Sequence, residues 1–175
     1  MEKRHISVYV MIFFLFTALI LSRIFPFFSN IVVAVLLSPL FFYPPKAVGL
    51  KNIKKGTAVG FLFSIPLIPF INPKEITFLF TLNTFLFAFA EEVFFRGYLF
   101  KALEIKNNHI KNVIVSLVFT LAHVIFYGSL FKITVFFPSL IFGYLYIYTG
   151  SILAPVIFHA VSNLFYETFL RHLIN

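Results

Sequence analysis

The sequence predicts an all-α membrane protein, a polytopic transmembrane helix bundle of about six to seven spans. Of its 175 residues, 61% are hydrophobic and only 11% are charged, and the mean hydropathy is +0.99. Soluble domains contain about 25% charged residues. Long apolar runs, by contrast, are typical of helices that cross a hydrocarbon core about 30 Å thick. The composition therefore excludes an ordinary soluble domain and a disordered chain, and the absence of Cys excludes a disulfide scaffold and a Cys nucleophile.

Seven apolar runs follow one another along the chain, and each is a candidate span. They cover residues 8–25, 27–43, 57–71, 76–100, 113–127, 131–148 and 152–169. Several are short for a full crossing, so six spans plus a re-entrant segment is the alternative to seven. Pro66 and Pro69 interrupt the third run and Pro138 the sixth, which predicts kinks there. Gly56 and Gly60 form a GxxxG pattern, which indicates close helix contact or has no meaning.

The basic residues favour one orientation of these spans. If the N-terminus is cytoplasmic, the outer segments hold Arg23, Lys74, Lys132 and Arg171. The cytoplasmic segments then hold the larger group: Lys3, Arg4, Lys46, Lys51, Lys54, Lys55, Lys101, Lys106 and Lys111. The positive-inside rule thus predicts a multi-pass protein of the cell membrane with a cytoplasmic N-terminus. The net charge of +8 suits contact with an anionic lipid bilayer, and the lack of interleaved basic and aromatic patches predicts no nucleic-acid partner.

Ionisable side chains interrupt three of the later apolar runs. Glu91, Glu92 and Arg96 share the run 76–100, His123 lies in the next run, 113–127, and His159 lies in the last run. Each such group costs roughly 2.5 to 3.5 kcal/mol within a membrane, so it normally faces the protein interior and marks function. At a rise of about 1.5 Å per residue, Glu91, His123 and His159 lie about 15 to 18 Å from the ends of their spans on one side of the membrane. We therefore expect a carboxylate and two imidazoles to meet at one depth.

Helical geometry separates the two carboxylates. Glu92 and Arg96 are offset by about 40° around a helix and can pair, whereas Glu91 is about 140° away from Arg96. Glu91 is then available as a base toward water in a dry site. His159 and Asn163, also four residues apart, can aim donors at one point, as an oxyanion hole requires. Taken singly, each His could instead be a packing residue and the Glu–Arg pair a structural ion pair.

Three motifs carry a family resemblance. Glu91-Glu92-Val93-Phe94-Phe95-Arg96 resembles an EExxxR signature, Phe119 to His123 an FxxxH motif and His159 to Asn163 an HxxxN motif. In this order, they resemble those of the CAAX protease and bacteriocin-processing family, also called the Abi family. This family of intramembrane endopeptidases is related to the Ras-converting CAAX prenyl proteases. We interpret residues 1–175 as a single membrane domain with a motif-bearing core at 79–166 and accessory amino-terminal spans at 8–71.

The resemblance implies hydrolysis of a peptide bond in a membrane-associated or lipid-linked protein or peptide. Glu91 and His123 would activate water, and His159 and Asn163 would stabilise the oxyanion. Glu92 and Arg96 would support the site. The substrate would be a carboxy-terminal tail, with or without a prenyl group, or a leader peptide.

Two alternatives stay open at this point. Glu91, His123 and His159 could form a zinc site of two imidazoles and one carboxylate, although the chain has no HExxH motif. We favour a glutamate-type reaction with no cofactor, because the neutral amide of Asn163 suits oxyanion binding better than metal ligation. A non-catalytic immunity or proton-relay protein is the alternative from a different class. It explains the buried charges but not the amide at the oxyanion spacing.

Overall fold

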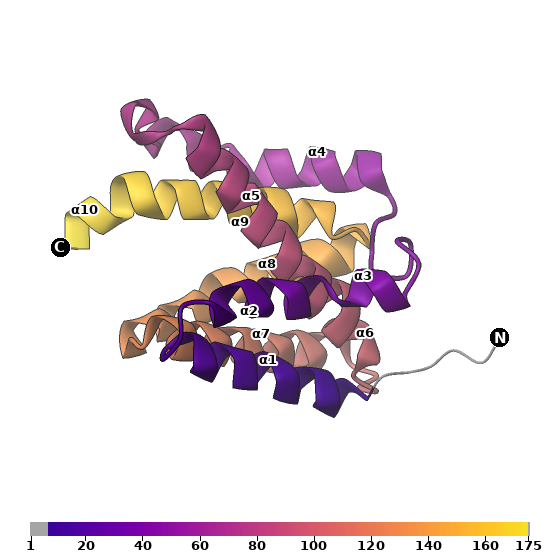
Figure 1. The fold of residues 1–175 in the computed structure, drawn as a ribbon. Helices are drawn as coiled ribbons and strands as arrows, with labels where there is room; N and C mark the ends of the chain where they lie inside the picture. Colours follow the sequence, from indigo (N-terminus) through magenta and orange to yellow (C-terminus); the bar gives the residue numbers. More distant parts are fainter. Residues whose placement is uncertain (1–6, 175) are drawn as a thin grey trace.

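The computed structural model describes residues 7–174, which form helices and connecting turns without a β-strand (Figure 1). The predicted all-α class is therefore confirmed. The α-helices are α1 (Val8–Ser22), α2 (Phe28–Leu37), α3 (Pro39–Phe42), α4 (Ile53–Ser64), α5 (Phe78–Glu92), α6 (Phe100–Ala102), α7 (Asn108–Tyr127), α8 (Phe136–Thr149), α9 (Leu153–Phe165) and α10 (Arg171–Ile174). The other helical elements are the 3₁₀ segments η1 (Ile68–Phe70), η2 (Pro73–Glu75) and η4 (Leu130–Val135), and the π-helical segments η3 (Val93–Leu99) and η5 (Tyr166–Leu170).

Four continuous helical stretches in the described part of the chain are long and apolar enough to cross a membrane. They are Phe78–Ala102, Asn108–Tyr127, Leu130–Thr149 and Leu153–Leu173. These stretches coincide with the last four predicted runs. The first two runs form shorter apolar helices, Val8–Ser22 and Phe28–Phe42. The number of spans beyond these four stays a prediction.

The third predicted run, 57–71, has the wrong bounds. Its helix, α4, begins earlier, at Ile53, and has ended by Ser64. Pro66 and Pro69 follow, and because proline lacks a backbone N–H and clashes with the preceding turn, the chain leaves the α-helix and forms η1. Pro138 behaves differently, since it lies in the first turn of α8, directly after η4. Instead of the predicted kink, the helix changes from 3₁₀ to α geometry where η4 meets α8.

The two glycines of the GxxxG pattern bring α4 close to α9. A Cβ atom at Gly60 would lie 2.9 Å from the carbonyl oxygen of Ala154, and one at Gly56 would lie 2.6 Å from the Ser151 hydroxyl. Any larger side chain would push the two helices apart, so the pattern marks close helix contact. An amino-terminal helix thus packs directly against one of the helices that carry the motifs.

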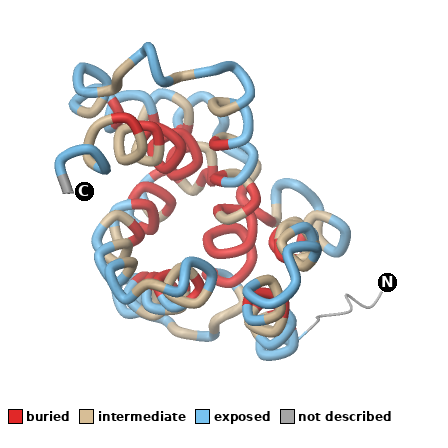
Figure 2. The backbone as a smooth tube through the Cα atoms, turned by 60° about the vertical axis from the view of Figure 1, so that its left-hand side comes forward, coloured by how far each residue is buried: buried red, intermediate tan, exposed pale blue. Residues whose placement is uncertain are grey.

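The remaining amino-terminal helices enclose the bundle from another side. α1 packs against α2 and α7, and α2 packs against α5. Buried residues face the middle of the bundle, and exposed ones face outward (Figure 2). Many of the exposed side chains are large and apolar, including Phe13, Phe41, Phe78, Leu130 and Phe137. A surface of this kind suits contact with lipid rather than water.

Basic side chains are divided between the two ends of the bundle. The loop before α4 and the chain around α6 meet at one end, where the ammonium group of Lys101 donates to the carbonyl of Ala47. Lys132 lies at the other end, beyond the last residue of α7. Lys101 and Lys132, which the orientation argument assigned to opposite sides, therefore lie at opposite ends of the bundle, and the orientation itself stays a prediction. Lys3 and Arg4, which also entered the orientation argument, lie outside the described residues.

Candidate active site

The first motif spans a change in helix geometry. Glu91 and Glu92 are the last residues of α5, and all seven residues of the following π-helical segment η3 are buried. A π-helical turn is wider than an α-turn and occurs frequently at functional sites. Gly97 allows this segment to pack tightly, because a Cβ atom there would lie 2.5 Å from the carbonyl oxygen of Val48.

Arg96 is completely buried within this segment. Its Nη1 donates to Oε1 of Glu92 at 3.1 Å, so the predicted pair is present in the structure. Its Nη2 donates to both the carbonyl oxygen and the hydroxyl of Ser139, at 2.8 and 2.6 Å. The guanidinium also lies over the rings of Phe119 and Phe142, 4.7 and 5.4 Å from their centroids. A buried cation without such partners would be strongly destabilising.

Glu92 also orients His159 on α9. The Nδ1 atom of His159 lies 3.0 Å from Oε1 of Glu92, so the ring N–H can donate to the carboxylate. The imidazole stacks on Phe142 with a centroid distance of 4.4 Å and an interplanar angle of 19°. Glu92 therefore joins Arg96 to His159. Helical spacing predicts the pairing of Glu92 with Arg96 alone, and the second bond, to His159, follows only from the packing of α9.

His123 is held in a similar way by its own helix, α7. Its Nδ1 atom lies 3.0 Å from the carbonyl oxygen of Phe119. Because a carbonyl can only accept, Nδ1 carries the proton of this bond, and in the neutral ring Nε2 is an acceptor. The Phe119 ring lies 4.3 Å from the imidazole and is fully buried. Phe119 is therefore a packing partner of the histidine rather than a lipid-facing side chain.

Glu91 faces both histidines. Its Oε1 lies 3.8 Å from Nε2 of His123, and its Oε2 lies 3.5 Å from Nε2 of His159. The side chain of Glu91 is 21% exposed, whereas that of Glu92 is fully buried. The two neighbouring carboxylates thus occupy different environments, one partly exposed and one enclosed. Helical geometry predicted that they point in different directions, whereas the exposure of Glu91 differs from the dry site that was expected for it.

Asn163 is the one predicted site residue for which the structure gives no contact with the others. It lies one turn beyond His159 on α9 and is half-buried. No hydrogen bond to its amide is found within residues 7–174. Its expected contribution to an oxyanion hole therefore stays a prediction, based on its position one turn from His159.

Ser139 and the ring of Phe142 are the site residues that the sequence analysis missed. Both lie on α8, within an apolar run that carries none of the three motifs. Ser139 is fully buried, and a buried serine beside Pro138 gives no indication of its partner. The only signal was the need of a buried arginine for more acceptors than one carboxylate provides.

The arrangement defines a class of protein. It is a helical membrane protein in which an accessible carboxylate and two imidazoles meet inside the bundle, beside a second carboxylate that is buried against an arginine. The sequence profile of the family described as type II CAAX prenyl endopeptidase Rce1-like matches residues 73–165, just over half of the chain. The chain belongs to this family, which confirms the resemblance seen in the motifs. No curated protein and no solved structure matches the chain.

Family membership implies a protease, and hence a peptide or protein as the substrate. No group of three His, Asp or Glu side chains within the described residues is arranged to hold a metal ion.

Proposed function

We propose that the chain is an intramembrane endopeptidase that hydrolyses a peptide bond in a membrane-associated or lipid-linked protein or peptide. The observation that carries this proposal is the partly exposed carboxylate of Glu91, which faces the Nε2 atoms of His123 and His159 at 3.8 and 3.5 Å. An ionisable group at this depth is costly in a merely structural role. Its accessibility suits contact with water and a substrate.

In the proposed reaction, Glu91 and His123 activate the attacking water. Because Nδ1 of His123 donates to the carbonyl of Phe119, its Nε2 is available to accept a hydrogen bond from that water. The second O–H of the water points to Glu91, which takes the proton as the water oxygen attacks the peptide carbonyl carbon. Because both O–H groups of the water donate to these two acceptors, a lone pair of the water oxygen faces the substrate carbonyl carbon.

His159 and Asn163 stabilise the negative charge that develops on the carbonyl oxygen. Because Nδ1 of His159 donates to Glu92, its Nε2 can donate to the oxyanion only in the doubly protonated ring. The buried pair of Glu92 and Arg96 keeps that ring in place. When the tetrahedral intermediate collapses, the C–N bond breaks and the proton held by Glu91 passes to the leaving amine.

The substrate is proposed from the family description and from the lipid-facing surface. A carboxy-terminal tail that carries a lipid would reach the site from the membrane, and a leader peptide is the alternative. We further propose that the chain is a multi-pass protein of the cell membrane with six to seven spans and a cytoplasmic N-terminus. The separation of basic side chains to the two ends supports this orientation.

We propose that this reaction proceeds without a metal. The neutral amide of Asn163 beside His159 supports this, because an amide suits oxyanion binding better than metal ligation. If zinc were bound, Glu91, His123 and His159 would be its ligands, and the metal would polarise the carbonyl or the water. Metal analysis of active purified protein tests the choice. Stoichiometric zinc, with inactivation by a chelator and recovery on addition of zinc, would decide against the metal-free reaction.

The decisive variant is Glu91→Gln. It keeps the size of the side chain but removes the base, so we expect turnover of a membrane-anchored peptide substrate to fall roughly 10² to 10⁴-fold. Cleavage is followed by mass spectrometry on purified protein in vesicles. Glu104→Gln, on an exposed loop, removes the same charge and should leave turnover unchanged. Turnover of the Glu91 variant close to that of the parent would refute the proposed base.

A further inference from the structure

A cavity of about 320 Å³ lies at the lysine-rich end of the bundle. Its lining includes three lysines, Lys51, Lys101 and Lys111, together with Asn108 and Tyr146, and no carboxylate. Lys101, the nearest of these lysines along the chain, is ten positions after Glu91 on one continuous helical stretch, which corresponds to roughly 15 Å at the rise of an α-helix. The cavity is therefore distinct from the candidate active site.

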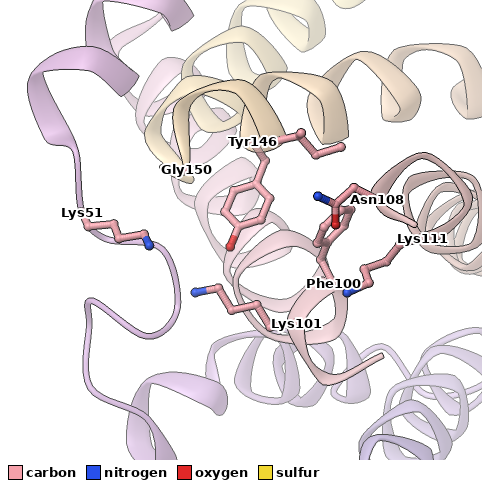
Figure 3. A pocket seen from close by; sticks show the side chains of 8 residues that line it. Lys51, Phe100, Lys101, Asn108, Lys111, Tyr146 and Gly150 are labelled. Carbon is pink, nitrogen blue, oxygen red and sulfur yellow. The ribbon is translucent and has the colours of Figure 1, made fainter. Parts of the chain in front are cut away.

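The lysines reach this cavity from three different elements. Lys51 comes from the loop before α4, Lys101 from α6 and Lys111 from the first turn of α7. Figure 3 shows the side chains of Lys51 and Lys101 pointing toward the space beside the Tyr146 hydroxyl, which points into the cavity. Tyr146 is itself 6% exposed, and its hydroxyl has no hydrogen-bond partner within the described residues.

The loop that carries Lys51 is fixed against the rest of the bundle. The side-chain amide of Asn52 donates to the carbonyl of Thr149 at 3.0 Å, and the Ile152 N–H donates to the carbonyl of Gly49 at 3.0 Å. Lys101 also donates to the carbonyl of Ala47, on the same loop. The backbone that carries Lys51 and the ammonium group of Lys101 are thus positioned before any ligand binds, which lowers the entropic cost of binding.

Charge and position together indicate the ligand. Like charges around one cavity repel each other, and an anion with several oxygen acceptors would offset this repulsion. The cavity lies where the stretches Phe78–Ala102 and Leu130–Thr149 end, which is the depth of lipid head groups. The apolar side chains of Phe100 and Ile147 in its lining suit the neighbouring glycerol part. We propose that the cavity binds a phosphate group, supplied by the head group of an anionic lipid.

Binding can be measured on the purified full-length chain in detergent. The probes are dihexanoyl phosphatidic acid below its micelle concentration, dihexanoyl phosphatidylcholine as the zwitterionic counterpart, and inorganic phosphate, with affinities from isothermal titration calorimetry. We expect saturable binding of the phosphatidic acid and much weaker binding of the other two. Equal binding of inorganic phosphate would support the phosphate site but assign it to the free ion. Equal affinity for both lipids, or no binding of phosphatidic acid and phosphate, would overturn the proposal.

Matched variants separate this site from diffuse surface charge. Replacing Lys51, Lys101 and Lys111 together by Gln should weaken phosphatidic acid binding roughly 100-fold, since each lysine near a membrane surface contributes about a factor of five. The same replacement of Lys46, Lys54 and Lys106, which are exposed at this end but do not line the cavity, should change the affinity less than about twofold. An equal loss in both triple variants would refute a defined site.

A single substitution guards against a folding defect in the triple variant. Lys51 is exposed and has no hydrogen bond or ion pair within the described residues, so Lys51→Glu should not disturb the fold. It reverses one charge of the cavity, and we expect roughly tenfold weaker binding of phosphatidic acid with an unchanged melting temperature. Unchanged affinity in this variant would also count against the site.

Discussion

At the scale of single residues, the burial of Arg96 depends on Ser139. The hydroxyl and carbonyl of this serine accept from one guanidinium nitrogen, while Nε of Arg96 is buried without a partner among the described residues. Ser139→Ala would remove an acceptor from a cation that already lacks one. We expect the free energy of unfolding to fall by about 1.5 to 3 kcal/mol, as is typical for hydrogen bonds to charged groups. Chemical or thermal unfolding in detergent measures the change.

Ser139 should also affect turnover through the chain of contacts from Arg96 to Glu92 and His159. Its effect as a positioning residue would be a lower kcat with an unchanged KM, and Ser139→Thr, which restores a hydroxyl, should recover part of it. Ser64→Ala is the control, since that buried hydroxyl donates only to a carbonyl of its own helix. A loss of stability with full kcat would show that Ser139 has a structural role only.

The same contacts show which parts of the site a sequence can predict. Glu92 and Arg96 lie four residues apart on one helix, so their pairing follows from helical geometry alone. The bonds from Arg96 to Ser139 and from Glu92 to His159 join segments 43 and 67 residues apart. They depend on how helices pack, and no local pattern specifies that. Common depth within the membrane was the one non-local signal, and it correctly brought Glu91 near the two histidines.

At the scale of elements, the contact between α4 and α9 supports the helix that carries His159. Gly60→Val would place methyl groups where a Cβ atom already lies 2.9 Å from the carbonyl oxygen of Ala154 and from Cβ of Ile157. We expect a loss of about 1 to 3 kcal/mol in stability from overpacking, and a loss of cleavage because α9 must move. Ala58→Val, on the exposed face of α4, should change neither melting temperature nor turnover. Equal behaviour of the two variants would contradict this account.

Elements were predictable where hydrophobic length alone decides them. The last four helical stretches match the predicted runs because each is a long apolar segment between polar turns. The predicted bounds of α4 were wrong for two reasons. Its first turn contains Lys54 and Lys55, a polar pattern typical of a loop, and Pro66 makes the helix end earlier than the apolar run does. The π-helical geometry of η3 has no signature in hydrophobic periodicity, so only the backbone of the folded chain reveals it.

At the scale of the whole molecule, the candidate active site and the lysine-lined cavity occupy different depths of one bundle. The first lies among buried helices, and the second lies where those helices end. A site in the membrane interior needs a fixed depth, and cationic groups at one surface help to set it. The charged groups of the candidate active site, inside the bundle, and the lysines of the cavity, at its end, are therefore both explained by one placement of the bundle in the membrane.

The membrane topology can be tested by labelling single introduced cysteines, because the chain itself contains no Cys. Lys74 and Lys106 are exposed and flank the stretch Phe78–Ala102, so a helix that crosses the membrane must place them on opposite sides. With the expected orientation, a membrane-impermeant maleimide should label Lys74→Cys on intact cells but Lys106→Cys only after lysis. Labelling is quantified by a mass shift on a gel, and the Cys-free parent is the control. The reverse pattern would invert the orientation, and labelling of both on intact cells would mean that this helix does not cross the membrane.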